Sequence, residues 1–162
     1  MLPPGLDHQI RFTGTWCSEE LDASQQETTR EAWWSIDTLL DVDSDLDASL
    51  VAEVQRRIRA GDVVLAHALA SIAFNPQDAD RSALALEILA GARATRFDAL
   101  VALIILKALM FGGETLKLAA IAAVGDLPRR LREDIFQAFL RTVAEATAEP
   151  DSVRAAAKAA LG

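Results

Sequence analysis

Gly113-Glu-Thr-Leu-Lys-Leu-Ala-Ala-Ile-Ala-Ala-Val-Gly125 is echoed 37 residues later by Asp151-Ser-Val-Arg-Ala-Ala-Ala-Lys-Ala-Ala-Leu-Gly162. Aligned on their closing glycines, both stretches place an aliphatic residue before a basic one, then paired alanines, then a second aliphatic residue. This pattern describes a short helix with one face of small side chains, ended by glycine. Repetition at this period is typical of helices stacked in an array. The sequence therefore predicts an all-α fold built from repeated helix pairs.

The second of these stretches resembles the second helix of a HEAT-like (armadillo-type) repeat. The matching residues are Asp151, Val153, Arg154, Ala156, Ala157, Ala160, Leu161 and Gly162. Residues 113–125 fit less closely because Lys117 stands in the arginine place, and residues 80–91 keep only the spacing and the final glycine. The resemblance extends over about residues 76–162. It implies a right-handed α-α superhelix of antiparallel hairpins, with a protein-binding surface and no catalysis.

Glycines, prolines and capping residues divide the chain into about eight expected helices in four hairpins. The expected ranges are about 25–41, 44–60, 62–74, 79–90, 95–111, 114–124, 128–147 and 150–162. Ser24–Glu27 and Thr95–Asp98 have the form of capping boxes, and Gly61 and Gly91 are expected to stop the helices before them.

The helix expected up to Phe111 is apolar on nearly every side, so we expect it in the middle of the array. Alanines on the second helix of each pair would allow close approach between helices. The larger side chains of the first helices are expected to fill the space between layers. They include Leu103, Leu106, Phe136 and Phe139.

The chain of 162 residues is expected to form one domain preceded by an extended N-terminal arm. Residues 1–23 would be the arm, 24–60 a divergent first hairpin, and 61–162 the HEAT-like hairpins. One cysteine, Cys17, excludes an intramolecular disulfide, and the N-terminus lacks the pattern of an export signal. The most apolar stretch, 99–113, is too short to span the hydrocarbon core of a bilayer, which is roughly 30 Å thick. We therefore expect a cytoplasmic protein.

Acidic residues are concentrated in the first third of the chain. Residues 1–50 carry a net charge of -9, whereas the whole chain carries -8, so the remainder is nearly neutral. Opposite charge steers association, so a basic protein partner is favoured and nucleic acid is disfavoured. The expected contact residues combine one anchoring tryptophan of an adjacent pair with neighbouring aspartates. They are Trp33, Trp34, Asp37, Asp41, Asp43, Asp45 and Asp47.

The alternating aspartates from Asp41 to Asp47 are open to three interpretations. A calcium loop would need glycine at its sixth position and glutamate at its twelfth, where this chain has Leu46 and Ala52. The alternatives are a solvated turn between helices, a weak divalent-ion site, or a docking surface for a basic partner.

The residues that carry chemistry in enzymes form no recognisable motif in this sequence. His8, His67 and Cys17 are too few for a soft-ligand metal site, and Gly112-Gly113 lacks the lysine and serine of a phosphate loop. The serines have no nucleophile-elbow motif around them. We expect no catalytic residues, no metal and no cofactor.

Three hypotheses for function remain. The leading one is a non-enzymatic protein–protein interaction module, within which a bacterial immunity-type inhibitor or adaptor is favoured. The second is a nucleic-acid-binding repeat protein that uses Arg93, Arg96, Arg129, Arg130 and Arg132. The last three arginines lie in the first turn of a helix, where the dipole disfavours cations; they either pair with nearby carboxylates or form a basic contact site. The third is a self-assembling subunit, with a homodimer through the C-terminal helix.

Overall fold

The computed structural model describes residues 36, 39–40, 46–75 and 78–162. Throughout these residues the fold is all-helical, without a β-strand, which confirms the all-α part of the prediction. None of the described helices has the length and hydrophobicity needed to cross a membrane. The expected arm 1–23 lies outside the described residues. Of the expected helix 25–41, the described residues are Ile36, Leu39 and Leu40, and all three are buried.

The helices follow one another through short connections. They are α3 (Ala48–Arg59), α4 (Val63–Phe74), α5 (Ala79–Gly91), α6 (Asp98–Phe111), α7 (Glu114–Val124), α8 (Arg129–Leu131), α9 (Gln137–Glu145) and α10 (Asp151–Leu161). A 3₁₀ turn, η1 (Thr95–Phe97), leads into α6, and a π-helical turn, η2 (Arg132–Phe136), joins α8 to α9. The helix expected from 128 to 147 is therefore present but contains a change of helical type.

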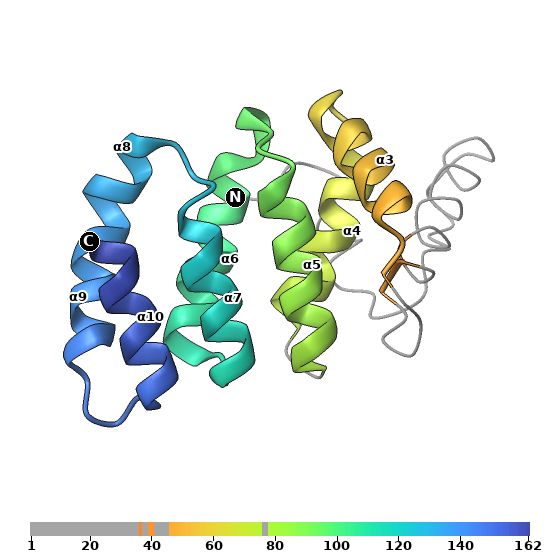
Figure 1. Ribbon diagram of the computed structural model, residues 1–162. Coiled ribbons are helices and arrows are strands. Elements are labelled where there is room, and N and C mark those ends of the chain that lie inside the picture. The colour runs from red at the N-terminus through yellow and green to blue at the C-terminus, as the bar shows by residue number, and fades with distance from the viewer. Residues whose placement is uncertain (1–35, 37–38, 41–45, 76–77) are drawn as a thin grey trace.

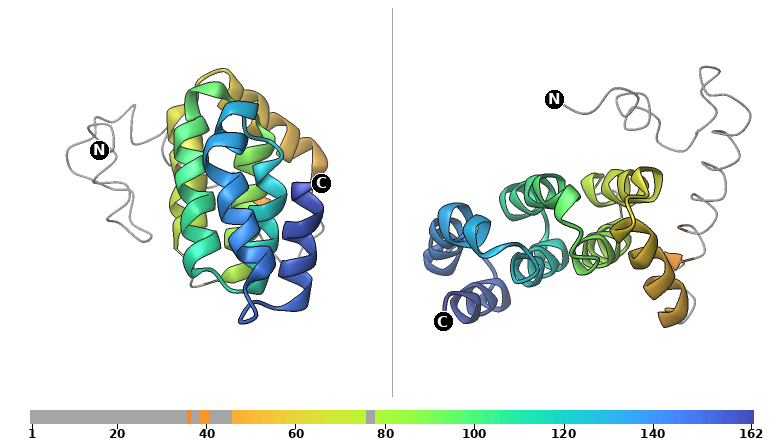
Figure 2. Two further views of the ribbon diagram at one scale, coloured as in Figure 1. Left: turned by 90° about the vertical axis from the view of Figure 1, so that its left-hand side faces the viewer. Right: turned by 90° about the horizontal axis from the view of Figure 1, so that it is seen from above.

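The helices lie in two layers (Figures 1 and 2). The first layer holds α4, α6 and α8–α9, and the second holds α3, α5, α7 and α10. Each first-layer helix packs against the helix that follows it, in the antiparallel pairs α4–α5, α6–α7 and α9–α10. Within the second layer α7 contacts both α5 and α10, so the two related stretches of sequence lie side by side.

Aliphatic side chains fill the space between the layers. Phe136, Ile104, Ile105, Leu86 and Leu65 are at most 1% exposed. The related helices α7 and α10 bury equivalent positions, among them Leu116, Val153, Ala120 and Ala157. Alanines at such positions let neighbouring helices approach closely, as ridge-and-groove packing requires.

Aspartates cap three of the helices, as their chemistry favours. Asp47 caps α3, Asp62 caps α4 and Asp78 caps α5, each accepting hydrogen bonds from backbone N–H groups of the first turn. Gly61 has φ +97°, a left-handed conformation that suits glycine, and it ends α3 as predicted. The turn from α3 to α4 is thus encoded by two adjacent residues.

Two predicted roles at helix ends are wrong, although the helix boundaries themselves lie within one residue of the prediction. Thr95–Asp98 does not form a capping box, because Thr95 opens η1 and no side chain caps η1 or α6. Gly91 does not stop α5: it lies in the last turn, and Arg93 takes the left-handed conformation with φ 49°. A Cβ on Gly91 would come within 2.8 Å of Nε2 of Gln55 on α3, so this glycine permits close packing.

The prediction for α6 is correct in position and wrong in burial. The helix lies between α4 and α8–α9 in the first layer (Figure 2), but no further layer of described helices covers its outer side. Leu103, expected in the core, is 49% exposed, Met110 is 54% exposed and Phe111 is 73% exposed. Phe136 is buried as predicted, and Leu106 and Phe139 are half-buried.

Candidate functional site

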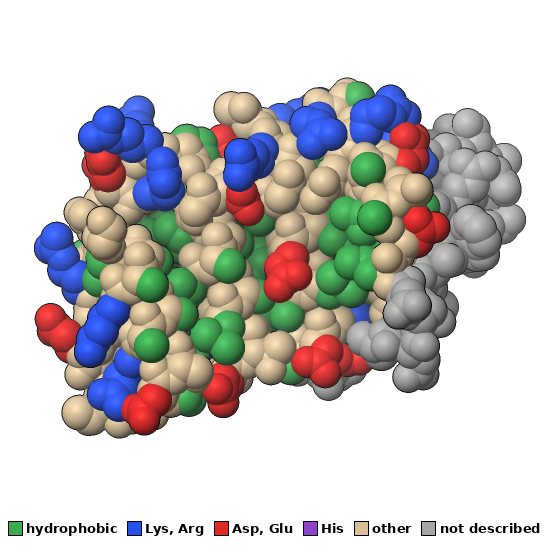
Figure 3. Space-filling view, viewed as in Figure 1, with side chains coloured by type: hydrophobic (Ala, Val, Ile, Leu, Met, Phe, Trp, Pro, Cys, Tyr) green, Lys and Arg blue, Asp and Glu red, His purple; other side chains and the backbone are tan. Residues whose placement is uncertain are grey.

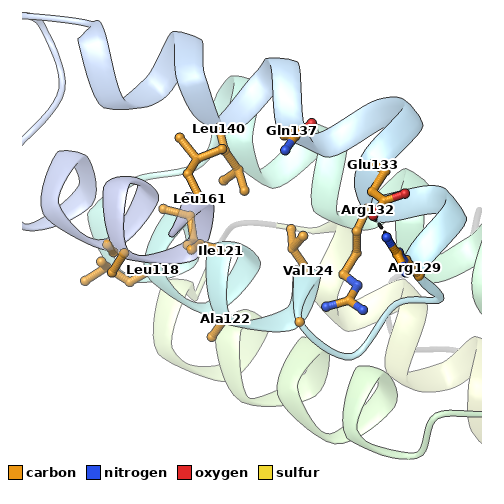
Figure 4. Close-up of a pocket in the computed structure, with 14 residues that line it drawn as sticks. Leu118, Ile121, Ala122, Val124, Arg129, Arg132, Glu133, Gln137, Leu140 and Leu161 are labelled. Carbon is orange, nitrogen blue, oxygen red and sulfur yellow. Dashed lines mark hydrogen bonds and ion pairs between the residues drawn. The ribbon is translucent and has the colours of Figure 1, made fainter.

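A groove of about 610 Å³ opens to solvent where α7, α8–α9 and α10 meet (Figure 4). Its floor is aliphatic, and its remaining wall is made largely of alanines from α7 and α10. The aliphatic residues are Leu118, Ile121, Val124, Leu140 and Leu161, which come from all three helices. We refer to this feature as the α7–α10 groove. Its polar residues, Arg129, Arg132, Glu133 and Gln137, all come from the α8–α9 segment.

The π-helical turn η2 brings two of these polar residues to the groove. The N–H of Gln137 donates to the carbonyl oxygen of Arg132, five residues earlier, which is the π-helical pattern. In an α-helix, two residues five positions apart point in directions that differ by about 140° around the axis. A π-helical turn has more residues per turn, so it brings the same two residues closer to one side. Arg132 and Gln137 therefore share one side of the helix. Figure 4 shows Arg132 extending toward the end of α7, beside Val124.

The three clustered arginines have different surroundings. Nε of Arg129 donates to Glu133 at 2.6 Å, which raises the pKa of Arg129 above its ordinary value. Arg130 lies 3.7 Å from Asp134, and it does not line the groove. Pairing with nearby carboxylates, one of the two predicted interpretations, is thus confirmed for these two residues. Arg132 forms no ion pair with any described residue.

The arginines proposed as a nucleic-acid contact lie along one edge of the molecule. Figure 3 shows basic side chains along the upper edge, interspersed with acidic ones. Arg93 belongs to the α5–α6 connection and pairs with Asp126 at 2.8 Å, and Arg96 lies 6.0 Å from the ring of Phe97. Arg129, Arg130 and Arg132 follow the next connection on this edge, and Arg56, Arg57 and Arg59 end α3. The structure therefore brings the predicted residues to a common edge and neutralises several of them.

Helix α6 carries three of the five large apolar side chains that are exposed among the described residues. Leu103, Met110 and Phe111 form an exposed group that we call the α6 face. The one cation beside them on this helix, Lys107, is turned toward α4: its Nζ donates to the carbonyl oxygen of Phe74 at 2.7 Å and lies 3.9 Å from that ring. The exposed part of the α6 face is therefore apolar.

Most of the predicted acidic site lies outside the described residues: Trp33, Trp34, Asp37, Asp41, Asp43 and Asp45. The described member is Asp47, which is exposed. Its Oδ1 accepts from the N–H groups of Ser49 at 2.9 Å and Leu50 at 3.2 Å. Asp47 thus has a structural role as the cap of α3.

His67 is a buried titratable side chain in the interior. It is 6% exposed, packs edge-on to Phe97 at 6.0 Å, and its Nδ1 finds no hydrogen-bond partner among the described residues. Burial lowers the pKa of His67 to about 4, so the imidazole is neutral at physiological pH. Burial also raises the pKa of Asp98. Among the described residues, no group of three or more His, Cys, Asp or Glu is placed to hold a metal ion.

Sequence reasoning identified the arginines at the groove but not the groove itself. The relation between 113–125 and 151–162 indicated that α7 and α10 are equivalent, and equivalent helices of a stack are neighbours. The π-helical turn has no signal in the sequence. No protein-family model matches the chain, and comparisons with curated proteins and with solved structures found no match.

Proposed function

We propose that this chain is a non-enzymatic protein-binding module, built as a HEAT-like right-handed stack of helix pairs. The observation that carries the proposal is the α6 face, where three large apolar side chains are about half or more exposed. Leu103 and Met110 lie two turns apart on one side of α6, and Phe111 lies at its end. Large apolar side chains that gather at the surface are typical of sites that bind other proteins. Burying an exposed side chain of this size contributes about 1.5 to 3 kcal/mol, so the face could anchor a partner.

The α6 face also has the form of an interface centre. Large apolar side chains near the middle of a contact commonly dominate its energy, while polar residues around them exclude water. The Lys107 ammonium group donates to a backbone carbonyl oxygen of α4, so a partner that covered the α6 face would not bury an unpaired charge. The face lies in the first layer, whose outer side no described helix covers.

The partner that we propose is a basic cytoplasmic protein, with this chain as an immunity-type inhibitor or adaptor. Its support is the charge distribution: the net charge of -9 in residues 1–50 against near neutrality elsewhere. The acidic residues would steer the encounter and the α6 face would supply affinity.

The test is a pull-down from lysate at low and high salt, followed by calorimetric titration of the protein retained. We expect Met110→Ser with Phe111→Ser to weaken binding at least tenfold, because two buried anchors are lost. Ile135→Ser is the matched control, since Ile135 is an exposed apolar residue of η2 outside the α6 face. Equal affinity of the two variants would contradict the proposal.

A second set of variants tests the acidic contribution. Asp37, Asp41, Asp43 and Asp45 would be changed to Lys, while Asp47 is kept because its removal would uncap α3. We expect slower association and a weaker dependence of affinity on salt. An unchanged association rate at low salt would remove the acidic surface from the proposal.

Nucleic-acid binding is the second candidate, favoured because the α5–α6 connection and the start of α8 lie at a common edge (Figure 1). These segments carry Arg93, Arg96, Arg129, Arg130 and Arg132. The weakness of this candidate is that Asp126, Glu133 and Asp134 pair with three of these arginines. Binding to duplex DNA that falls steeply with salt, and is lost when Arg96 and Arg132 become Gln, would support this function. Absence of binding at low salt would exclude it.

A further inference from the structure

We propose that the α7–α10 groove binds an aliphatic carboxylate, a fatty-acid-like molecule with one anionic head and an unbranched apolar tail. This site is separate from the α6 face and does not depend on the function proposed above. The groove has a volume of about 610 Å³. That volume lies within the usual range for small-molecule sites.

The floor of the groove favours an alkyl chain over a peptide. Its side chains are leucines, an isoleucine, a valine and alanines, which offer no hydrogen bonds. The nearby carbonyl oxygens at the end of α7 are already used: those of Ala122, Ala123 and Val124 accept from the next connection at 3.1, 3.0 and 3.2 Å. A peptide laid on this floor would bury N–H and C=O groups without partners, which is costly. A hydrocarbon tail has no such groups.

The rim of the groove favours an anionic head. Arg129 is occupied by Glu133 at 2.6 Å, whereas Arg132 extends along the groove without an ion pair to any described residue (Figure 4). A guanidinium group binds a carboxylate through two parallel hydrogen bonds, and the geometry is specific. Gln137 also lines the groove, and Figure 4 shows it on α9, away from the Arg132 guanidinium. The mouth thus supplies one available cation above an apolar floor.

The test is calorimetric titration of the 162-residue chain with decanoate, below the concentration at which decanoate forms micelles. We expect 1:1 binding that tightens about fourfold for each methylene group that enters the groove, measured along butyrate, hexanoate, octanoate and decanoate. 1-Decanol, which keeps the tail and lacks the charge, should bind at least tenfold more weakly than decanoate.

Three variants locate the site. Arg132→Gln should weaken decanoate binding about tenfold. Arg130→Gln, a neighbouring exposed arginine outside the groove, should change it less than twofold. Ala160 lines the groove and is exposed, so Ala160→Trp should fill the groove without disturbing the core and should abolish binding. Unchanged helicity and melting temperature would show that each variant folds.

Several outcomes would overturn the proposal. They are the absence of decanoate binding at millimolar concentration, equal affinity for decanoate and 1-decanol, equal effects of Arg132→Gln and Arg130→Gln, and full binding by the Ala160→Trp variant. Capture of an acidic peptide in place of decanoate would assign the groove to a protein partner instead.

Discussion

Protonation of His67 should make the stability of this protein fall between neutral and mildly acidic pH. The side chain is buried beside Phe97, and burial lowers its pKa from 6.5 to about 4. Between these two values the unfolded chain binds a proton that the folded chain excludes. Stability contributed by the neutral imidazole is therefore fully present above pH 6.5 and is lost as the pH falls toward the folded-state pKa.

The magnitude follows from the two pKa values. On going from pH 7.5 to pH 5.0, protonation of the unfolded state lowers the free energy of unfolding by about 2 kcal/mol, because each pKa unit corresponds to about 1.4 kcal/mol. Most aspartates and glutamates remain ionised at pH 5.0, so histidine protonation dominates this interval, and comparison with a His67 variant separates His67 from His8. Asp98 has the opposite sign: burial raises its pKa, so its contribution to stability falls as the pH rises through its titration.

The assay is urea unfolding of the native chain and of His67→Leu at both pH values, followed by circular dichroism. Between pH 7.5 and pH 5.0, the free energy of unfolding should fall by about 2 kcal/mol more in the native chain than in His67→Leu, because the variant has no imidazole to protonate at this position. At pH 7.5 the variant should be equally stable or more stable, because it removes the unpaired Nδ1 from the interior. Parallel losses in the two proteins would refute the assignment of a depressed pKa to His67.

Three further predictions concern stability and can be measured by the same unfolding assay. Gly61→Ala should lower the free energy of unfolding by about 1 kcal/mol, because Gly61 has a positive φ. Gly113→Ala should leave stability unchanged or raise it, because there is free space around Gly113. Equal effects of the two substitutions would contradict the conformational argument. Lys117→Met and Glu149→Gln should show a coupling of about 1 kcal/mol in a double-mutant cycle. These ion-pair partners are only 12% and 18% exposed, and additive effects would show that the pair is unimportant. Ser82→Ala should lower the free energy of unfolding by about 1 kcal/mol. The buried hydroxyl of Ser82 donates a hydrogen bond at the end of α4, where the carbonyl oxygens of Ile72 and Asn75 are both within reach. No change in stability would show that these two carbonyl oxygens find other partners.

The parts of the fold that were predictable are those encoded by residues close together in the sequence. Gly61 and Asp62 specify the end of α3 and the start of α4 by their own backbone and side-chain chemistry. Gly112-Gly113 likewise separates α6 from α7. The charge partner of Arg129 lies one helical turn away and could be inferred from spacing alone.

The parts that were not predictable depend on neighbours distant in sequence. Gly91 looks like a helix stop, yet its lack of a side chain accommodates Gln55, whose Nε2 donates to the carbonyl oxygen of Ile88 at 3.2 Å. An apolar helix such as α6 can be recognised from its composition, but composition does not show how many sides other helices cover. Phe111 is exposed for that reason.

The candidate sites were predictable to different extents. The acidic residues lie mostly outside the described part of the chain, so that site stays a prediction. The α7–α10 groove depends on how three helices meet and on a π-helical turn, and neither leaves a pattern in the sequence. Arg132 could be named as a candidate contact, but the apolar floor beneath it could not.

The π-helical turn between α8 and α9 contains one residue more than a regular α-helical path would need. Deleting one exposed residue there, such as Asp134, would convert the turn to α-helix and leave the packing of α9 on α10 in place. Because the extra residue is accommodated within the turn itself, the same deletion would change the path locally and leave Arg129 close to its present position. Single-residue deletions should therefore be tolerated better at this point than elsewhere in the described helices. A change in chain length at this turn would therefore reshape the rim of the groove, where Arg132 and Gln137 lie, before it altered whether the protein folds.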